Sequence, residues 1–250
     1  PGRLVVRLQN FDPPDREVVG LVASQLAYGR VKQILASVRD ALERMGSPAD
    51  FVMHTSPRRM MQVFADFKHR FTPGASIAGL LTGAGALMRK HGSLQACLLG
   101  HLKPEHATLL PALEGFIAEL GECAAAELKS VLPSPEKGSA CKRCNLFLRW
   151  MVRSDDVDPG GWHEVPEAKL VVPLDTHMLR IGRRLGFTDR ATANLRTAED
   201  ITSAFRKLVP EDPVRYDFAL TRLGIRDDLD IQETLAQWST SLQPASQCKS

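Results

Sequence analysis

The sequence predicts an all-α fold. One segment after another repeats apolar residues every three or four positions, and proline or glycine marks most of the segment ends. Only residues 165–174 combine β-branched side chains with flanking prolines, as is typical of an extended segment. With 250 residues, 44% of them hydrophobic and 24% charged, the chain has the composition of an ordinary globular protein and the length for one large domain or two joined lobes.

The expected helices follow one another along most of the chain. The first begins after Asp12-Pro13-Pro14-Asp15, carries valines and leucine at helical spacing, and ends near Gly29. The second covers 31–45 and stops at Gly46-Ser47-Pro48. Comparable amphipathic runs lie at about 58–67, 76–91, 106–131, 141–153, 175–185, 198–208, 213–223 and 229–240.

One region departs from the helical pattern. The turn sequence Asp158-Pro159-Gly160-Gly161 precedes it, and Val171 and Val172 lie between two prolines. We therefore expect a short extended insertion near 158–174, either a hairpin or a loop.

Composition and charge exclude several classes of protein. The formal net charge of +3 permits a nucleic-acid partner without requiring one. No apolar run approaches the roughly 20 residues of a membrane span, and the N-terminus has no signal-peptide core, so we expect a cytoplasmic protein without a membrane partner. Five cysteines at irregular spacing do not form a secreted disulfide framework. Cys141-x-x-Cys144 lacks a second pair or a nearby histidine, so we expect no metal and no cofactor.

Lys142 is a candidate nucleophile at the start of the helix expected over 141–153. That helix has an apolar seam and, on a different face, the polar and basic residues Lys142, Asn145, Arg149 and Arg153. A solvated surface would explain this face. However, the positive end of the helix dipole and the neighbouring Arg143 both disfavour an ammonium ion at Lys142. A neutral amine there could attack a sugar carbon.

Asp175 opens the helix expected over 175–185, which also carries Arg180, Arg183 and Arg184. Aspartate is a favoured N-cap because its carboxylate accepts hydrogen bonds from the first turn, and capping alone would explain its position. Capping and catalysis are compatible, since amide donors keep the carboxylate ionised. An ionised carboxylate beside a sugar can stabilise the positive charge that develops as a base departs.

Both segments resemble those of the helix-hairpin-helix DNA glycosylases. The string Asp175–Gly186 is similar to their catalytic aspartate segment, and Gly138–Arg143 stands where lyase-competent members carry a DNA-gripping hairpin and a Schiff-base lysine. Ala140 replaces the usual second glycine of that hairpin. The lysine and the aspartate are 33 residues apart because of an insertion at 154–172, and so long a separation is similar to that of archaeal 8-oxoguanine glycosylases.

The chain from Asp12 to about Arg226 also resembles the DUF2400 family, on the stretches Lys142–Arg153, Pro173–His177 and Asp212–Leu220. The resemblances imply a two-lobed helix-hairpin-helix glycosylase fold, with residues 30–150 as the central lobe, 1–29 plus 151–250 as the second lobe, and the active cleft between them. They imply a monomer that acts on double-stranded DNA containing a damaged base. The expected activity is that of a DNA glycosylase and AP lyase that excises an oxidised purine such as 8-oxoguanine.

The same resemblances imply roles for further residues. Gln25, at the lip of the cleft, would probe the flipped base or its former partner, and Asp217 would accept hydrogen bonds from guanine N1 and N2. Trp150 and Phe147 would offer stacking faces. The residues expected to contact DNA are Gly138, Ser139, Arg143, Arg149, Arg180 and Arg183. Simpler roles stay open: a solvated Gln25, an ion pair of Asp217 with Arg215 or Arg222, and a core position for Phe147.

Two other functions fit the sequence. The scaffold could bind damaged DNA without catalysis, or basic helices could contact RNA phosphates. Lys142 and Asp175 facing each other across an open cleft would favour the enzyme. Either residue buried in a core ion pair would favour the binding proteins.

Overall fold

A computed structural model describes residues 8–124, 126, 128 and 131–225 of the chain. This part is mostly helical, so the all-α prediction is confirmed at that level. The two-lobed partition stays a prediction. None of the helices in the described ranges has the length and the apolar composition that a membrane crossing requires.

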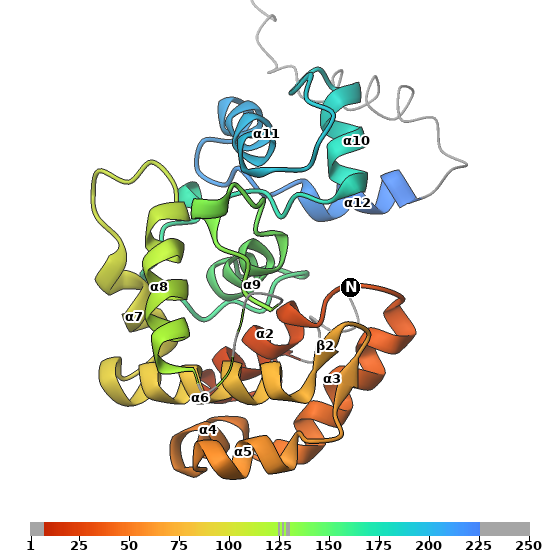
Figure 1. Cartoon of the computed structure of the whole chain (residues 1–250). Helices are drawn as coiled ribbons and strands as arrows, with labels where there is room; N and C mark the ends of the chain where they lie inside the picture. The colour runs from red at the N-terminus through yellow and green to blue at the C-terminus, as the bar shows by residue number, and fades with distance from the viewer. Residues whose placement is uncertain (1–7, 125, 127, 129–130, 226–250) are drawn as a thin grey trace, which may run out of the picture.

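The first part of the fold is built around one long central helix, α6 (Figure 1). Glycine lets its neighbours approach closely, because a Cβ atom on Gly83 would lie 2.6 Å from the carbonyl oxygen of Leu120, and one on Gly85 would lie 2.1 Å from that of Val52. Helices α4, α5, α7 and α8 pack against α6. The elements are α2 (Pro13–Gln25), α3 (Val31–Met45), α4 (Pro48–His54), α5 (Pro57–Val63), β1 (Lys68–His69), β2 (Thr72–Pro73), α6 (Gly74–His91), α7 (Leu94–His101) and α8 (Leu110–Cys123).

The second part of the fold places α9 between α2 and α6 on one side and the group α10, α11 and α12 on the other (Figure 1). Helix α9 packs on α2 and is buried almost all round, as expected of a helix inside the molecule. Helix α10 packs on α12. The elements are the 3₁₀ turns η1 (Pro135–Lys137) and η2 (Glu167–Lys169) and the helices α9 (Lys142–Val152), α10 (Thr176–Arg184), α11 (Leu195–Leu208) and α12 (Asp217–Ile225).

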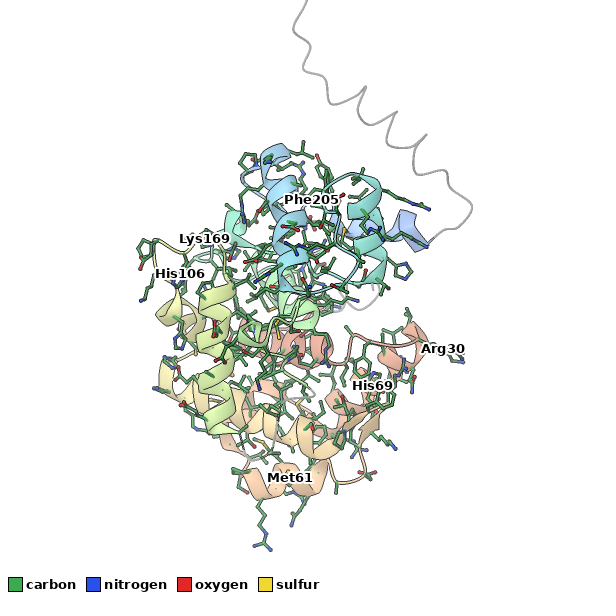
Figure 2. The ribbon with its side chains drawn as sticks, turned by 45° about the horizontal axis from the view of Figure 1, so that its top comes forward. Arg30, Met61, His69, His106, Lys169 and Phe205 are labelled. Atoms are coloured by element: carbon green, nitrogen blue, oxygen red, sulfur yellow. The ribbon has the colours of Figure 1, made fainter. Side chains whose placement is uncertain are left out.

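The insertion near 158–174 is a loop and not a hairpin of strands. Its turn folds back on α9, where the amide of Gly160 donates to the carbonyl of Trp150. Residues 170–174 are buried, and the amide of Val172 donates to the hydroxyl of Thr202. Because its amides find such partners, this segment has no ladder with a second strand. Lys169 in η2 lies beside the loop that carries His106 (Figure 2) and accepts a hydrogen bond from the amide of Leu109.

Several predicted boundaries are corrected by the structure. The helix expected over 106–131 is α8, which begins at Leu110 because Pro111 fits only the first turn. The helix expected over 213–223 begins at Asp217, after two turns. The sequence patterns missed the short helices α4 and α7 and the hairpin β1–β2. The helix expected over 229–240 lies outside the described residues.

Candidate active site

The N-termini of α9 and α10 bring Lys142 and Asp175 together. The Nζ atom of Lys142 lies 3.0 Å from Oδ2 of Asp175. The lysine side chain is 38% exposed and the aspartate side chain 20%, so the pair lies at a surface opening and not in the core. The two residues form a direct ion pair at the mouth of a pocket. The sequence predicts either that they face each other across an open cleft or that one of them is buried in a core ion pair, and the observed arrangement lies between these two.

Asp175 is the N-cap of α10. Its Oδ1 accepts a hydrogen bond of 2.9 Å from the amide of Met178, while Oδ2 is left for Lys142. Burial acts to raise the pKa of Asp175, but the charge of Lys142 and the amide of Met178 outweigh it and hold the pKa below the usual aspartate range. The carboxylate is therefore ionised at neutral pH, and the structure bears out the capping geometry.

A pocket of about 130 Å³ opens beside this pair. Ligand pockets commonly measure about 300–1,000 Å³, so a flipped purine could enter only if the pocket widened. Its wall is mainly apolar, with polar groups gathered at Lys142, Asp175, Arg149 and Asp217. The remaining lining residues are Ala27, Val31, Ile34, Leu35, Leu146, Trp150, Pro173, Phe218 and Thr221.

The prediction that Arg149 contacts DNA is wrong, because the structure buries it. Only 3% of its side chain is exposed, and its Nη1 lies 2.5 Å from Oδ2 of Asp217. Its Nε and Nη2 donate to Asp158, which also pairs with Arg153. A buried guanidinium held by two carboxylates is satisfied within the protein and cannot reach a phosphate.

Asp217 lines the pocket as expected, and among the described side chains it pairs with Arg149 and not with Arg215, while the side chain of Arg222 lies outside the described part of the chain. Arg149 binds Oδ2, and the hydroxyl of Thr221 donates to Oδ1 at 3.3 Å. Burial raises the pKa of Asp217 above the usual aspartate range, although the neighbouring Arg149 acts in the opposite direction. The pocket therefore presents a carboxyl group and a guanidinium side by side.

Gln25 does not lie at the lip of a cleft, which corrects the prediction. It is completely buried at the end of α2, because α9 packs on that helix. Its Nε2 donates to the hydroxyl of Ser24 at 3.1 Å, and it is absent from the pocket wall. Only its backbone carbonyl takes part near the site, by accepting a hydrogen bond of 2.9 Å from Arg143.

The two predicted stacking residues are separated by the structure. Trp150 is buried and contributes to the pocket wall. Phe147 is also buried, but it packs edge-to-face on Trp162 with the ring centroids 5.1 Å apart and does not line the pocket. Phe147 therefore occupies the core, which is the simpler of the two roles that the sequence allowed.

The hairpin-like segment before Lys142 rests on the start of α11. Gly138 has a φ of 72°, the left-handed region that favours glycine, and it ends the turn η1. Its carbonyl accepts from the amide of Leu195, and Ser139 forms a bridge with Asn194. The hydroxyl of Ser139 accepts from the amide of Cys141 at 3.2 Å.

The remaining predicted DNA contacts fall into two groups. Arg143 turns inward to the carbonyl of Gln25, and its guanidinium lies 5.2 Å from the ring centroid of Tyr28. Arg180 and Arg183 are exposed on α10, where together with Arg184 they line a surface hollow of about 470 Å³. Arg143 is thus half-buried, whereas Arg180 and Arg183 are exposed.

The sequence patterns missed an exposed aromatic residue in the hairpin β1–β2. Phe71 is 81% exposed at the tip of the hairpin β1–β2. The guanidinium of Arg70 lies between it and Tyr28, 5.6 Å and 5.8 Å from the two ring centroids. Tyr28 in turn contacts Arg143, the neighbour of Lys142. Strands of two residues carry no periodicity, so no sequence pattern could have indicated this tip.

Comparison with known proteins places the chain in one family. Residues 5–226 match the family model described as a protein of unknown function, DUF2400. The match covers most of the chain, which therefore belongs to that family. No curated protein and no solved structure matches significantly.

Proposed function

We propose that this DUF2400 protein is a DNA glycosylase with AP lyase activity that excises an oxidised purine such as 8-oxoguanine. One observation carries the proposal: an amine, Nζ of Lys142, lies 3.0 Å from the carboxylate of Asp175 at the mouth of a pocket. An amine beside an ionised carboxylate is the pair that nucleophilic displacement at a sugar carbon requires.

The first step is displacement of the base. Asp175 takes a proton from the ammonium group of Lys142, and the freed lone pair on Nζ forms a bond to C1′ as the bond from C1′ to the base breaks. The base leaves with that electron pair and receives a proton through Asp175 or water. The carboxylate also stabilises the positive charge that develops on the sugar in the transition state.

The second step cleaves the strand. The bond from C1′ to the ring oxygen breaks, the oxygen takes a proton, and an imine forms between Nζ of Lys142 and C1′. Loss of a proton from C2′ then expels the 3′ phosphate by β-elimination, with Asp175 placed to accept protons. Water hydrolyses the imine and releases the lysine. This route needs no metal, oxidant or reductant.

The pocket supplies the features that would choose the base. Asp217 can accept hydrogen bonds from the N1 and N2 protons of a guanine-type base, and Arg149 fixes the position of its carboxyl group. Trp150 and Phe218 contribute apolar wall against which a ring can pack. Because the pocket must widen for a purine, we expect it to open when DNA binds.

Two surface features support binding of a DNA duplex. Arg180 and Arg183 on α10 are exposed within the helix that Asp175 caps, so phosphate contacts there would position the strand at the site. Phe71 is an exposed aromatic side chain that could fill the space left in the duplex by a flipped nucleotide. A monomer presents both features to one duplex.

A release assay tests the proposed function. The purified chain is incubated with duplexes that carry one lesion each, including 8-oxoguanine, uracil and an alkylated purine, and free base and strand breaks are measured separately. We expect release of 8-oxoguanine with strand cleavage, and loss of both by orders of magnitude in Asp175→Asn, which keeps the cap but removes the charge. Preferred release of uracil or alkylated bases would contradict the substrate assignment.

A non-catalytic DNA-binding protein is the second candidate, favoured by one observation. The ion pair of Lys142 and Asp175 joins α9 to α10, so it could serve only to hold the two helices together. In that case Asp175→Asn and Lys142→Gln would reduce stability, and no lesion in the panel would be released by the unmodified chain.

A further inference from the structure

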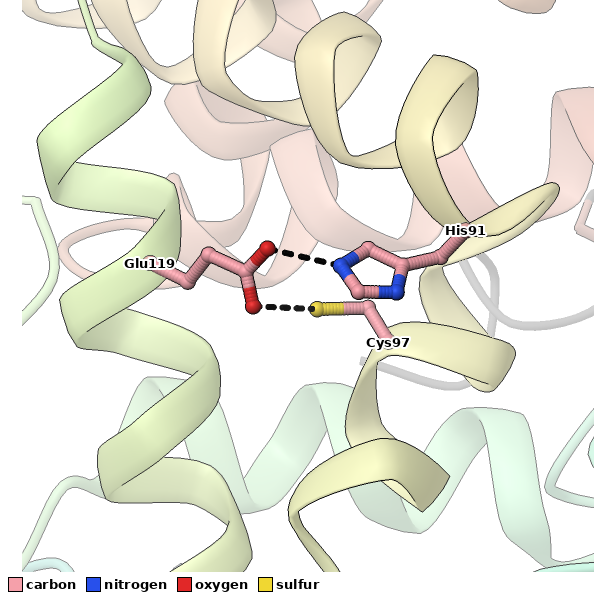
Figure 3. A group of neighbouring side chains, drawn as sticks. All are labelled: His91, Cys97 and Glu119. Atoms are coloured by element: carbon pink, nitrogen blue, oxygen red, sulfur yellow. Dashed lines mark hydrogen bonds and ion pairs between the residues drawn. The ribbon is translucent and has the colours of Figure 1, made fainter.

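A separate cluster of side chains converges on Glu119 in α8, away from the pocket (Figure 3). Oε1 of Glu119 lies 2.6 Å from Nε2 of His91, and Oε2 lies 2.9 Å from Nε2 of His101. The sulfur of Cys97 is 3.7 Å from the same Oε2. One atom each from His91, Cys97 and Glu119 lie within 4.8 Å of one another.

The cluster is half-buried although it holds four polar groups. Cys97 is completely buried, and only 13% of the Glu119 side chain is exposed. The side chains of His91 and His101 are 23% and 33% exposed. Three helices contribute to it, since His91 ends α6 and Cys97 and His101 lie on α7.

Gly115 on α8 leaves room for the imidazole ring of His101. A Cβ atom on Gly115 would lie 2.5 Å from Nδ1 of His101, closer than real Cβ contacts allow. The glycine therefore lets the ring lie flat against α8 and turn its Nε2 toward Glu119. Helix interiors disfavour glycine by about 1 kcal/mol relative to alanine, so its presence in α8 fits a need for this close approach.

We propose that His91, Cys97, His101 and Glu119 form a structural zinc site that fastens α6 and α7 to α8. Two imidazoles, a thiolate and a carboxylate are ligands that zinc accepts, and four protein ligands are the number typical of closed structural sites. No sequence pattern indicated this site, because its cysteine is remote from Cys141 and Cys144 and its ligands come from three helices.

Ligand atoms of His91, Cys97 and Glu119 already lie within 4.8 Å of one another, and His101, which contacts only Glu119 among them, must turn toward the ion to complete the set. Zinc ligands lie at about 2.0–2.3 Å, so the ligand atoms of a tetrahedral site are separated by about 3.3–3.8 Å. The contacts of the two histidines with Glu119 are shorter than this by less than an ångström, and that of Cys97 already falls in the range. Lys90 also contacts Oε1 of Glu119 at 2.7 Å, but its side chain is 64% exposed and can move into solvent.

The first test uses Co²⁺ as a spectroscopic probe and Zn²⁺ in competition with a coloured chelator, on the full chain. We expect one ion per chain and, with Co²⁺, a near-ultraviolet sulfur charge-transfer band. Cys97→Ser should lose that band and bind Zn²⁺ at least about 100-fold more weakly, since even an outer-shell partner typically contributes about 10- to 100-fold. Cys123→Ser, four residues after Glu119 on α8 but outside the proposed ligand set, should keep both.

The second test changes no ligand. Gly115→Ala should displace His101 and weaken Zn²⁺ binding about 10- to 100-fold, whereas Gly121→Ala in the same helix meets nothing within 4 Å and should leave binding unchanged. Circular dichroism of each ion-free variant shows whether it is folded.

The proposal is overturned if the folded parent chain binds no Zn²⁺ at one equivalent, or if the sulfur band persists in Cys97→Ser. Either result would leave the glycosylase proposal untouched, because no pocket residue is involved.

Discussion

The contact between Lys142 and Asp175 depends on two local features 33 residues apart in the sequence. Each residue stands at the start of a helix, and each helix start was visible as a change from loop residues to an apolar stripe. Their meeting was not derivable from those patterns and was implied only by the family resemblance. The structure now shows the distance between the two side chains and an ionised carboxylate at Asp175.

The first prediction concerns Asp175 and pH. Its pKa in the folded chain is lowered from 3.8, because the charge of Lys142 and the Met178 amide outweigh burial. A carboxyl group whose pKa is lower in the folded state stabilises the fold above its unfolded pKa, and this contribution is lost as the pH falls through the folded pKa. Urea unfolding should show the parent chain more stable than Asp175→Asn at pH 7, with the difference shrinking as the pH falls below 3.8. A difference that stays constant over this range would contradict the ionised pair.

The second prediction concerns base recognition by Asp217. Asp217→Asn should lower 8-oxoguanine excision about 10- to 150-fold, or about 1.5–3 kcal/mol, because a charged acceptor is lost from a dry pocket. Excision of weaker substrates should fall less. Asp158→Asn is the matched control, since it removes the other carboxylate on Arg149 but does not line the pocket. Asp158→Asn should reduce stability without changing the ratio of 8-oxoguanine excision to excision of weaker substrates. An equal loss of excision for all substrates in Asp217→Asn would contradict a role of Asp217 in base recognition.

Arg149 and Gln25 show what residue patterns could not predict. Arg149 lies on the same helical face as Lys142, which suggested solvent, yet its partner Asp217 is 68 residues further along the chain. Gln25 stands at a helix end, which is usually exposed, but α9 covers it. In both cases the burial follows from long-range packing that one sequence does not reveal.

At the scale of elements, three long amphipathic helices were predicted closely, whereas the ends of α8 and the two short helices α4 and α7 were not. Helices α3, α6 and α9 agree with the expected ranges within about two residues. Helix α4 has 7 residues and α7 has 8, so neither carries enough turns for a clear periodic signal. The insertion kept the extended backbone expected from its prolines and valines but formed no ladder, because a buried hydroxyl and not a strand took up the Val172 amide.

The third prediction concerns the hairpin β1–β2. Phe71→Ala should reduce excision from duplex DNA while leaving cleavage of a single-stranded abasic site nearly unchanged, because only the duplex has a gap to fill. Leu208→Ala removes another exposed hydrophobic side chain, 62% exposed, on α11 and serves as control. Equal effects of the two substitutions on duplex excision would show that Phe71 has no specific role.

At the scale of the whole molecule, the pocket is a product of topology. Its wall takes residues from α3, α9, the segment before α10 and α12, which are spread over almost 200 positions of the sequence. A buried network of Arg149, Arg153 and Asp158 holds the insertion against α9 behind this wall. The all-α class could be predicted from periodicity, whereas the pocket could not, because no local pattern specifies which helix ends meet.

Borohydride trapping tests the central claim most directly. Borohydride reduces an imine between enzyme and DNA to a stable amine, so the adduct reports the nucleophile itself. The parent chain and Lys137→Gln, which changes an exposed lysine five positions earlier, should give adducts with a duplex that carries 8-oxoguanine or an abasic site. Lys142→Gln should give none while remaining folded and bound to DNA, because its side chain lies at the surface opening. Adducts in equal yield from Lys142→Gln would contradict the assignment of Lys142 as the nucleophile.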